Sequence, residues 1–392
     1  MGATTSVGHV IADDPGTSLP APAPAPPDGY LDAVGGQPLL PAARQAWLSA
    51  TEQAWSDPAR LHHGGRRAGL ILDAARSSIA GHLGVRPDDV YFASSGPTAL
   101  ATAISGLIAS RNAVSGRVVA TAVESLAVLE PLRRWSDDVD LVPVTAVGAL
   151  NLPAFESALA RPAAIACVQA ANAEVGTRQP LDRAHALALA AGVPLVVHAV
   201  QVIGRDPMPE HWDVLAASAR DWGGPAGVGV LAVRPSLRWT PDASPDRGWV
   251  GGFPDIAGAA SAAAALEYLT PHRAAESARL AALVAALRQE LPVHVSGLVV
   301  AGDDIDRLPH IVTFTCEGVT GEALVTELDR RGYSVASGSA CTSDARLPSQ
   351  VLAAMGLSAA ASIRVSLPFG CTVQTVEGFN AVLPEAVEAA RR

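Results

Sequence analysis

The middle of the chain alternates short apolar segments with stretches of helical periodicity. We expect strands at Arg117–Ala122, Val139–Pro143, Ala163–Gln169, Val193–His198 and Val228–Val233, with helical stretches between them. Such alternation builds a parallel sheet, because each crossover helix brings the next strand back in the same direction. The sequence therefore predicts an α/β fold with a doubly wound, mostly parallel sheet.

Segments on either side of this alternation extend the fold. Gly29–Asp32 predicts a short strand, and helices are expected near Pro41–Ser56 and at Gly64–Leu83. After the alternation, helices at Ile256–Leu269 and Arg273–Leu291 lead into a stretch of mixed α and β character. This final stretch predicts a smaller C-terminal domain.

The first 28 residues differ in composition from the rest. They are rich in Pro, Ala and Gly and include P-A-P-A-P-A-P-P at Pro20–Pro27, which favours an extended chain without a core. They lack the basic start and apolar stretch of a signal peptide, and no apolar run elsewhere is long enough for a membrane span. We expect a disordered tail at residues 1–28, a large domain at 29–255 and a small C-terminal domain at 256–392.

Charge and cysteine content narrow the possible functions. Lys+Arg 28 against Asp+Glu 38 give a net charge of -10, which disfavours nucleic-acid binding through a general basic surface. Cys167, Cys316, Cys341 and Cys371 fit neither a disulfide framework nor a metal-knuckle spacing, so we expect a reducing, cytoplasmic setting and no metal. The chain contains no lysine, and therefore no side-chain amine that could form a Schiff base.

Two short runs are candidates for chemistry. Y-F-A-S-S-G-P-T-A-L at Tyr91–Leu100 predicts a strand, a glycine turn and a helix, which presents backbone N–H groups to an anion. S-V-A-S-G-S-A-C-T-S at Ser334–Ser343 surrounds Cys341 with small residues, as in a loop that exposes a reactive thiol. The alternative for Cys341 is a small buried cysteine in a turn.

Further motifs follow one another along the chain. They are D-P-A-R-L-H-H-G-G-R-R-A at Asp57–Ala68, A-N-A-E-V-G-T-R-Q-P at Ala171–Pro180, V-V-H-A-V-Q-V-I-G at Val196–Gly204, S-A-R-D-W-G-G-P-A-G-V-G-V-L at Ser218–Leu231, L-P-H-I-V-T-F at Leu308–Phe314 and S-Q-V-L-A-A-M-G at Ser349–Gly356. With the Cys341 run, they resemble the cysteine desulfurases of the class V aminotransferase group. The resemblance extends from Gly29 to the C-terminus. It implies a PLP-transferase fold of type I, the cofactor pyridoxal phosphate (PLP), a dimer, and a cysteine that receives sulfur as a persulfide.

The chain departs from this family where the cofactor would be held. Asp221 stands where the family has the lysine that forms the PLP aldimine, and Arg220 where it has a histidine. His198 stands where the family has an aspartate that keeps the pyridine nitrogen protonated. By this resemblance, PLP would be bound without a covalent bond or not at all.

The surroundings of the cofactor site differ as well. Ser125 stands where the family has a histidine that stacks on the ring. In the phosphate turn formed by Ser95 and Gly96, Pro97 stands where a threonine is expected, and proline has neither a hydroxyl nor an N–H. A longer Arg-rich loop is missing between Gly252 and Phe253, and Ala33, Val34, Gly35 and Gly36 replace a polar segment of the substrate pocket.

Four other residues match the family. Asn172, Gln201 and Ser218 stand where the family touches the cofactor, and Arg364 where it grips the substrate carboxylate. Each has a structural alternative: Asn172 and Gln201 as strand caps, and Ser218 as a small residue at a tight packing point. Arg364 could pair instead with a nearby acid such as Asp221.

Three functions are compatible with these residues. The first is a PLP-independent member of the family that acts in sulfur metabolism as a sulfur relay or a partner subunit through Cys341. The second is an active PLP-dependent desulfurase or C–S lyase with a non-covalently bound cofactor. The third is a small-molecule binding or structural subunit that reuses the cleft. The expected partners are a second copy or an active desulfurase in a dimer and a sulfur-acceptor protein, without nucleic acid or membrane.

Overall fold

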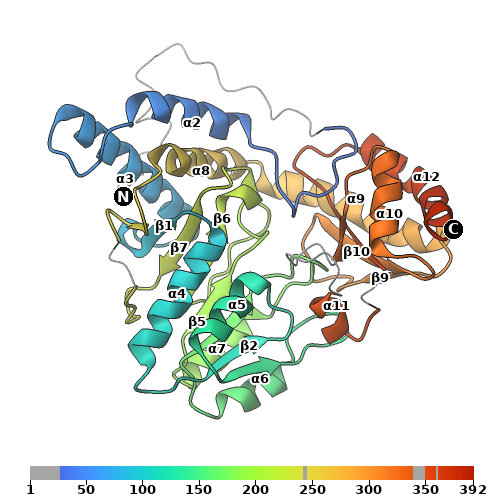
Figure 1. Cartoon of the computed structure of the whole chain (residues 1–392), viewed down its shortest axis with the longest axis horizontal. Helices are drawn as coiled ribbons and strands as arrows, with labels where there is room; N and C mark the ends of the chain where they lie inside the picture. Colours follow the sequence, from blue (N-terminus) through green and yellow to red (C-terminus); the bar gives the residue numbers. More distant parts are fainter. Residues whose placement is uncertain (1–26, 242–244, 339–348, 359–360) are drawn as a thin grey trace.

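The structure is a computed structural model of the chain, and it describes residues 27–241, 245–338, 349–358 and 361–392. A large sheet with its helices forms one part of the molecule, and a smaller sheet beside α9, α10 and α12 forms the other (Figure 1). Most of the predicted tail lies outside the described residues, and so does Cys341.

The large sheet is doubly wound and mostly parallel, as predicted. Its strand order is β3-β2-β4-β5-β6-β7-β1-β8, and only β7 runs antiparallel to its neighbours β6 and β1. The strands are β1 Val90–Ala93, β2 Val118–Thr121, β3 Val139–Val142, β4 Ile165–Gln169, β5 Leu195–His198, β6 Val214–Ser218, β7 Gly229–Val233 and β8 Trp249–Val250. Strand β6 was not expected from the sequence; its V-L-A-A-S run is short and lies directly before the segment matched to the family's lysine.

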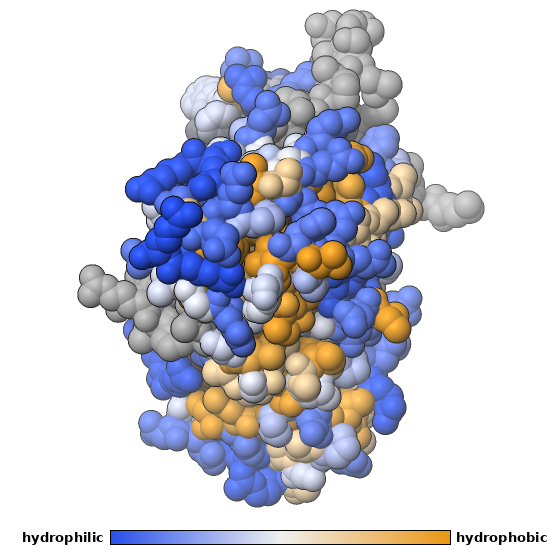
Figure 2. Space-filling view, turned by 90° about the vertical axis from the view of Figure 1, so that its right-hand side faces the viewer, coloured by the Kyte–Doolittle hydropathy of each residue, from blue (hydrophilic) through white to orange (hydrophobic). Residues whose placement is uncertain are grey.

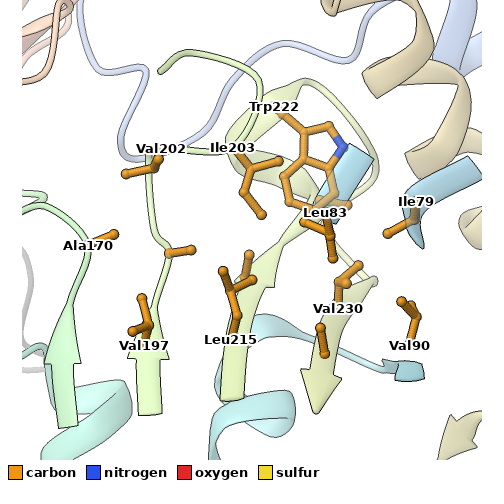
Figure 3. Packing of buried hydrophobic residues seen from close by; sticks show 14 of the residues in the cluster. Ile79, Leu83, Val90, Ala170, Val197, Val202, Ile203, Leu215, Trp222 and Val230 are labelled. Atoms are coloured by element: carbon orange, nitrogen blue, oxygen red, sulfur yellow. The ribbon is translucent and has the colours of Figure 1, made fainter. Parts of the chain in front are cut away.

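Helices cover both faces of this sheet. One face packs against α4 (Gly96–Arg111) and α5 (Leu126–Trp135). The other packs against α2 Pro41–Gln53, α3 His63–Leu83, α6 Leu152–Leu159, α7 Leu181–Ala190 and α8 Ile256–Leu269. Figure 3 shows Val197, Leu215 and Val230 on three neighbouring strands, with Ile203 and Trp222 packed over them. These large apolar side chains fix the strand ends that carry the candidate site.

The smaller sheet is antiparallel, with the order β11-β12-β10-β9. It consists of β9 Leu298–Ala301, β10 Ile311–Cys316, β11 Ala336–Ser337 and β12 Ser362–Ser366. The accompanying helices are α9 Arg273–His294, α10 Gly321–Arg330, α11 Gln350–Ala354 and α12 Val373–Ala390. Seen from this end, the molecule shows a band of hydrophobic residues flanked by hydrophilic ones (Figure 2).

Two segments connect the sheets in ways that the sequence did not indicate. Instead of the predicted short strand, Gly29–Asp32 forms isolated bridges from Tyr30 to Ser334 and from Asp32 to Ser366. Conversely, α8 follows the predicted domain boundary but shares the core of the large sheet. The division into domains at residues 255 and 256 stays a prediction.

The described residues offer neither a membrane-spanning helix nor a metal-ligand cluster. Over those ranges, every helix is too short or too polar to cross a membrane. Within the same ranges, the His, Cys, Asp and Glu side chains form no group of three or more suited to a metal ion.

Candidate functional site

The candidate residues gather at one edge of the large sheet. Asn172 follows β4, His198 ends β5, and Ser218 ends β6. Because these strands are parallel, their carboxyl ends meet at the same edge, which is where ligands bind in open α/β sheets. The fold therefore brings together residues that are far apart in the sequence.

At the position matched to the lysine, the structure holds a buried carboxyl group. Asp221 lies in the short 3₁₀ turn η2 (Ala219–Trp222) and is 6% exposed. Its Oδ1 accepts a hydrogen bond from Gln201 Nε2 at 3.0 Å. Burial raises the pKa of Asp221 to about 6, and the positive charges of Arg220 and Arg205 oppose this rise.

Both polar ends of the Gln201 amide are occupied. While Nε2 donates to Asp221, Oε1 lies 3.0 Å from His310 Nε2. An amide oxygen only accepts, so the hydrogen of His310 must be on Nε2. Burial lowers the pKa of His310 well below its usual value, with a further contribution from Arg205 and Arg364, so the ring is neutral. Both polar atoms of the Gln201 side chain are therefore bonded to other side chains of the protein.

His310 and Arg205 are site residues that sequence reasoning did not single out. His310 appears only inside the run L-P-H-I-V-T-F, and Arg205 directly follows the run that ends at Gly204. Arg205 is 1% exposed, donates from Nη2 to Gln37 Oε1 at 2.7 Å, and lies 4.1 Å from the ring centre of Phe369. Although burial lowers the pKa of Arg205 to about 10, its guanidinium stays charged at neutral pH.

The position matched to the pyridine partner is a buried, neutral histidine. His198 Nδ1 lies 3.2 Å from Ser125 Oγ, so these two predicted site residues contact each other. Burial lowers the pKa of His198 to about 4. A neutral imidazole cannot supply the negative charge that would keep a pyridine nitrogen protonated.

The predicted anion turn is well formed and contains an additional hydroxyl. Ser95 caps α4, and its Oγ accepts from Thr98 N at 3.1 Å and lies 2.8 Å from Thr98 Oγ1. Pro97 occupies the first turn, where its missing N–H costs little. Gly96 packs so closely that a Cβ there would lie 2.9 Å from the Cβ of Ser218, which therefore does lie at a tight packing point. Thr98 was present in the run but was given no role by sequence reasoning.

Asn172 holds the turn after β4. Its Oδ1 accepts from Glu174 N and Val175 N, each at 2.9 Å, and its Nδ2 donates to Val123 O at 3.2 Å. These bonds use the amide for the backbone of its own turn, in agreement with the capping alternative.

Arg364 pairs with an acid, as the structural alternative allowed, but the acid is Asp32 and not Asp221, the example given from the sequence. Its Nη2 lies 3.0 Å from Asp32 Oδ1, because the bridge between Asp32 and Ser366 brings this carboxylate next to β12. Asp221 instead is bonded by Gln201. Arg220 donates to Gly35 O, so it holds the segment that was expected to line the substrate pocket.

The residues in this structure do not fit PLP bound as a lysine aldimine. A carboxyl group cannot form an imine, and Asp221 and Gln201 bond to each other. His198 is neutral and contacts Ser125, and the turn at Pro97 lacks one N–H.

The sheet order and the site at the carboxyl ends of its strands define the class: a PLP-transferase fold of type I. The sequence profile "Aminotransferase class-V" matches residues 30–379. A protein described as "IscS-like cysteine desulfurase" from Mycobacterium tuberculosis is 33% identical over 383 residues, covering 93% of this chain and 97% of that protein.

Solved structures are similar in fold. A NifS-like protein gives a TM-score of 0.84 with 24% identity, covering 92% of this chain and 99% of its own. A NifS-like protein from Rickettsia africae gives 0.82 with 21% identity and the same two coverages, 92% and 99%. The chain belongs to the cysteine desulfurase family within the class V aminotransferases. The names of these relatives place the family in sulfur metabolism.

Proposed function

We propose that this chain is a PLP-independent member of the cysteine desulfurase family that acts in sulfur metabolism as a sulfur relay or partner subunit. One observation carries the proposal. Asp221, at the position of the family's lysine, is buried and bonded to Gln201, while Gln201 is also bonded to His310. The side chains that would face a cofactor therefore contact one another, and the chain has no lysine that could replace the missing one.

Sulfur relay requires no cofactor. The thiolate of Cys341 would attack the terminal sulfur of a donor persulfide, R–S–SH, forming Cys341–S–SH and releasing the donor as a thiol. A thiolate of an acceptor protein would then attack the same terminal sulfur and regenerate Cys341. Each step forms one S–S bond and breaks one, so no oxidant or reductant is needed. Cys341 itself lies outside the described residues, and its role rests on the sequence match.

The partners follow from this role. The donor would be an active desulfurase, either as the second subunit of a heterodimer or as a separate dimer, and the acceptor a thiol protein. The dimer is proposed from the resemblance to the cysteine desulfurases, and a relative named "Cysteine desulfurase IscS" matches 92% of this chain. A reducing cytoplasm is the compartment in which such thiols persist.

The first experiment is a visible absorbance spectrum of the purified full-length protein with added PLP, followed by borohydride reduction and mass spectrometry. We expect no retained chromophore and no reduced adduct, because Asp221 forms no imine. Tightly retained PLP without an adduct would contradict PLP independence and favour a non-covalent PLP enzyme. The hydroxyls of Ser95 and Thr98 beside the α4 N-terminus are the groups that favour this second candidate.

The relay is tested separately with a labelled donor persulfide. Label is expected on Cys341 and is expected to be lost in Cys341→Ser, while the dimer stays intact. Label on Cys167, Cys316 or Cys371 instead would rule out Cys341 as the acceptor. Cys167, Cys316 and Cys371 are buried, which makes them suitable internal controls.

A further inference from the structure

Helix α11 packs on segments that follow two strands of the large sheet, although it belongs to the C-terminal part of the sequence. Its side chains Val351 and Leu352 cluster with Val123 and Val175, which follow β2 and β4. Its N-cap residue, Ser349, is 3% exposed, and Ser349 Oγ accepts from Leu352 N at 3.1 Å. This small contact connects the two parts of the molecule.

A buried carboxylate lies at the N-terminus of this helix. Glu174 is 4% exposed, and its carboxylate is hydrogen-bonded by the Ser349 side chain. A Cβ on Gly338 would lie 2.5 Å from Glu174 Oε1, an atom that is buried and has no hydrogen-bond partner within the described ranges. Glu174 therefore contacts the residues on both sides of segment 339–348.

The groups around Glu174 come from several elements. From β12, Arg364 faces the carboxylate and is shared with Asp32 at 3.0 Å. From β10, the Thr313 hydroxyl donates to Glu174 O at 2.5 Å, and from its own turn Asn172 Oδ1 accepts from Glu174 N at 2.9 Å. The last two bonds involve only the backbone of Glu174, so they hold it in either protonation state.

The Glu174 carboxyl group changes its protonation state within the neutral pH range. Burial raises the pKa of Glu174 to about 7, against the opposing effects of Ser349 and Arg364. At pH 8 the group carries a charge at a buried contact where one oxygen lacks a donor among the described residues. Local opening that admits water relieves this cost.

We propose that Glu174 is a protonation-dependent anchor of α11: its neutral carboxyl keeps the helix N-terminus against the segments that follow β2 and β4, and its ionisation favours local release. The inference goes beyond the proposed function, because it depends on neither PLP nor persulfide chemistry. In this proposal Glu174 also holds Ser349, the first described residue after segment 339–348.

Hydrogen exchange of the full-length protein tests the anchor. The α11 amides of Ala353 and Met355, bonded to Ser349 O and Val351 O, report its opening after correction for intrinsic exchange. If opening returns the Glu174 pKa from about 7 to its ordinary 4.5, the opening equilibrium rises about tenfold between pH 6 and pH 8. Peptides from α10 are the internal reference and should show no such rise.

Glu174→Gln should abolish the pH dependence and keep α11 protected at both pH values. Glu124→Gln is the matched control. Glu124 is also buried, its pKa is also raised to about 7 by burial, and its Oε1 is bonded to Thr121 and the Gln169 backbone. This control should retain the wild-type rise at α11, because Glu124 bonds α11 through its backbone oxygen, which accepts from Gln350 Nε2 at 2.7 Å, while its carboxyl is held by Thr121 and Gln169.

A second variant keeps the test decisive if Glu174→Gln fails to fold. Ser349→Ala removes a donor that lowers the Glu174 pKa, so the rise in opening should level off at a higher pH than in the wild type. A loss of the helix cap alone would raise exchange equally at every pH. The anchor is overturned by a wild-type α11 without pH dependence, by an unchanged rise in Glu174→Gln, or by an unshifted plateau in Ser349→Ala.

Discussion

Gln201 and Asp221 are joined by a hydrogen bond of 3.0 Å between Nε2 and Oδ1. The bond links the turn after β5 to the turn after β6. Gln201 adopts a left-handed backbone with φ 59, which is uncommon for a residue other than glycine and persists only where surrounding contacts determine it. The bonds to Asp221 and His310 are such contacts, so this edge of the sheet is organised by the protein's own side chains.

The same pair predicts that restoring the lysine will not restore cofactor binding. In Asp221→Lys, the new ammonium would be buried beside Arg205 and Arg220 and would lose the bond from Gln201. We expect a loss of about 2–4 kcal/mol in unfolding free energy. We also expect no borohydride-reducible PLP adduct, because His198 and Pro97 still differ from the family. Urea unfolding and mass spectrometry measure the two outcomes.

Asp221→Asn is the matched control, since its amide oxygen still accepts from Gln201. Its unfolding free energy should stay within about 1 kcal/mol of the wild type. A reduced adduct in Asp221→Lys would show that the lysine alone separates this chain from a PLP enzyme.

The predictable parts of the fold were those with strong periodicity. The alternating segments gave the doubly wound sheet, and Ile256–Leu269 was predicted with the bounds that α8 has. The packing of α8 could not be predicted in this way, because its Ala-rich surface is apolar nearly all round and does not reveal which core it enters.

The candidate site was predictable in composition but not in pairing. Motif order identified Asp221, Gln201 and His198, yet the partner of each is decided by tertiary contacts. Arg364 illustrates this, since Asp32 lies 332 positions away in sequence and reaches it only through the bridge to Ser366. His310 lies inside one of the matched runs and Arg205 directly after another, but neither run gave them a role, so only the structure relates them to the site.

His198 should give the protein a pH-dependent stability term. Its folded pKa of about 4 lies below the ordinary 6.5, so the unfolded chain takes up a proton first as the pH falls. The corresponding stabilisation is fully present above pH 6.5 and is lost between pH 6.5 and about 4, by up to about 3 kcal/mol. His198→Gln should remove this decline in urea unfolding.

The control for His198 is His63→Gln, which replaces an exposed histidine. Asp221 and Glu174 act in the opposite direction, because burial raises the pKa of each and the folded state then gains protons as the pH falls. Comparison of each variant with the wild type cancels their contribution. Parallel profiles for His198→Gln and the wild type would contradict a neutral buried histidine.

The ion pair between Arg364 and Asp32 should be a large stabilising contact. The Arg364 side chain is 4% exposed, so Asp32→Ala removes a counter-charge from a buried guanidinium. We expect a loss of about 2–4 kcal/mol in unfolding free energy. The control is the surface pair of Arg60 and Asp57, where Arg60 is 67% exposed and Arg60→Ala should cost less than about 1 kcal/mol. Equal losses in the two variants would contradict the assigned pairing.

Gly229 lets β7 approach the anion turn. A Cβ at this position would lie 2.0 Å from Ser95 O, a backbone atom that cannot move without displacing the N-terminus of α4. Gly229→Ala should therefore cost about 2–4 kcal/mol in unfolding free energy. Gly227 in the same segment has no other atom within 4 Å of its added Cβ, so Gly227→Ala should stay within about 0.5 kcal/mol of the wild type. An equally small loss of unfolding free energy in Gly229→Ala would contradict this close packing. It would show that the turn at Ser95 can shift away from β7.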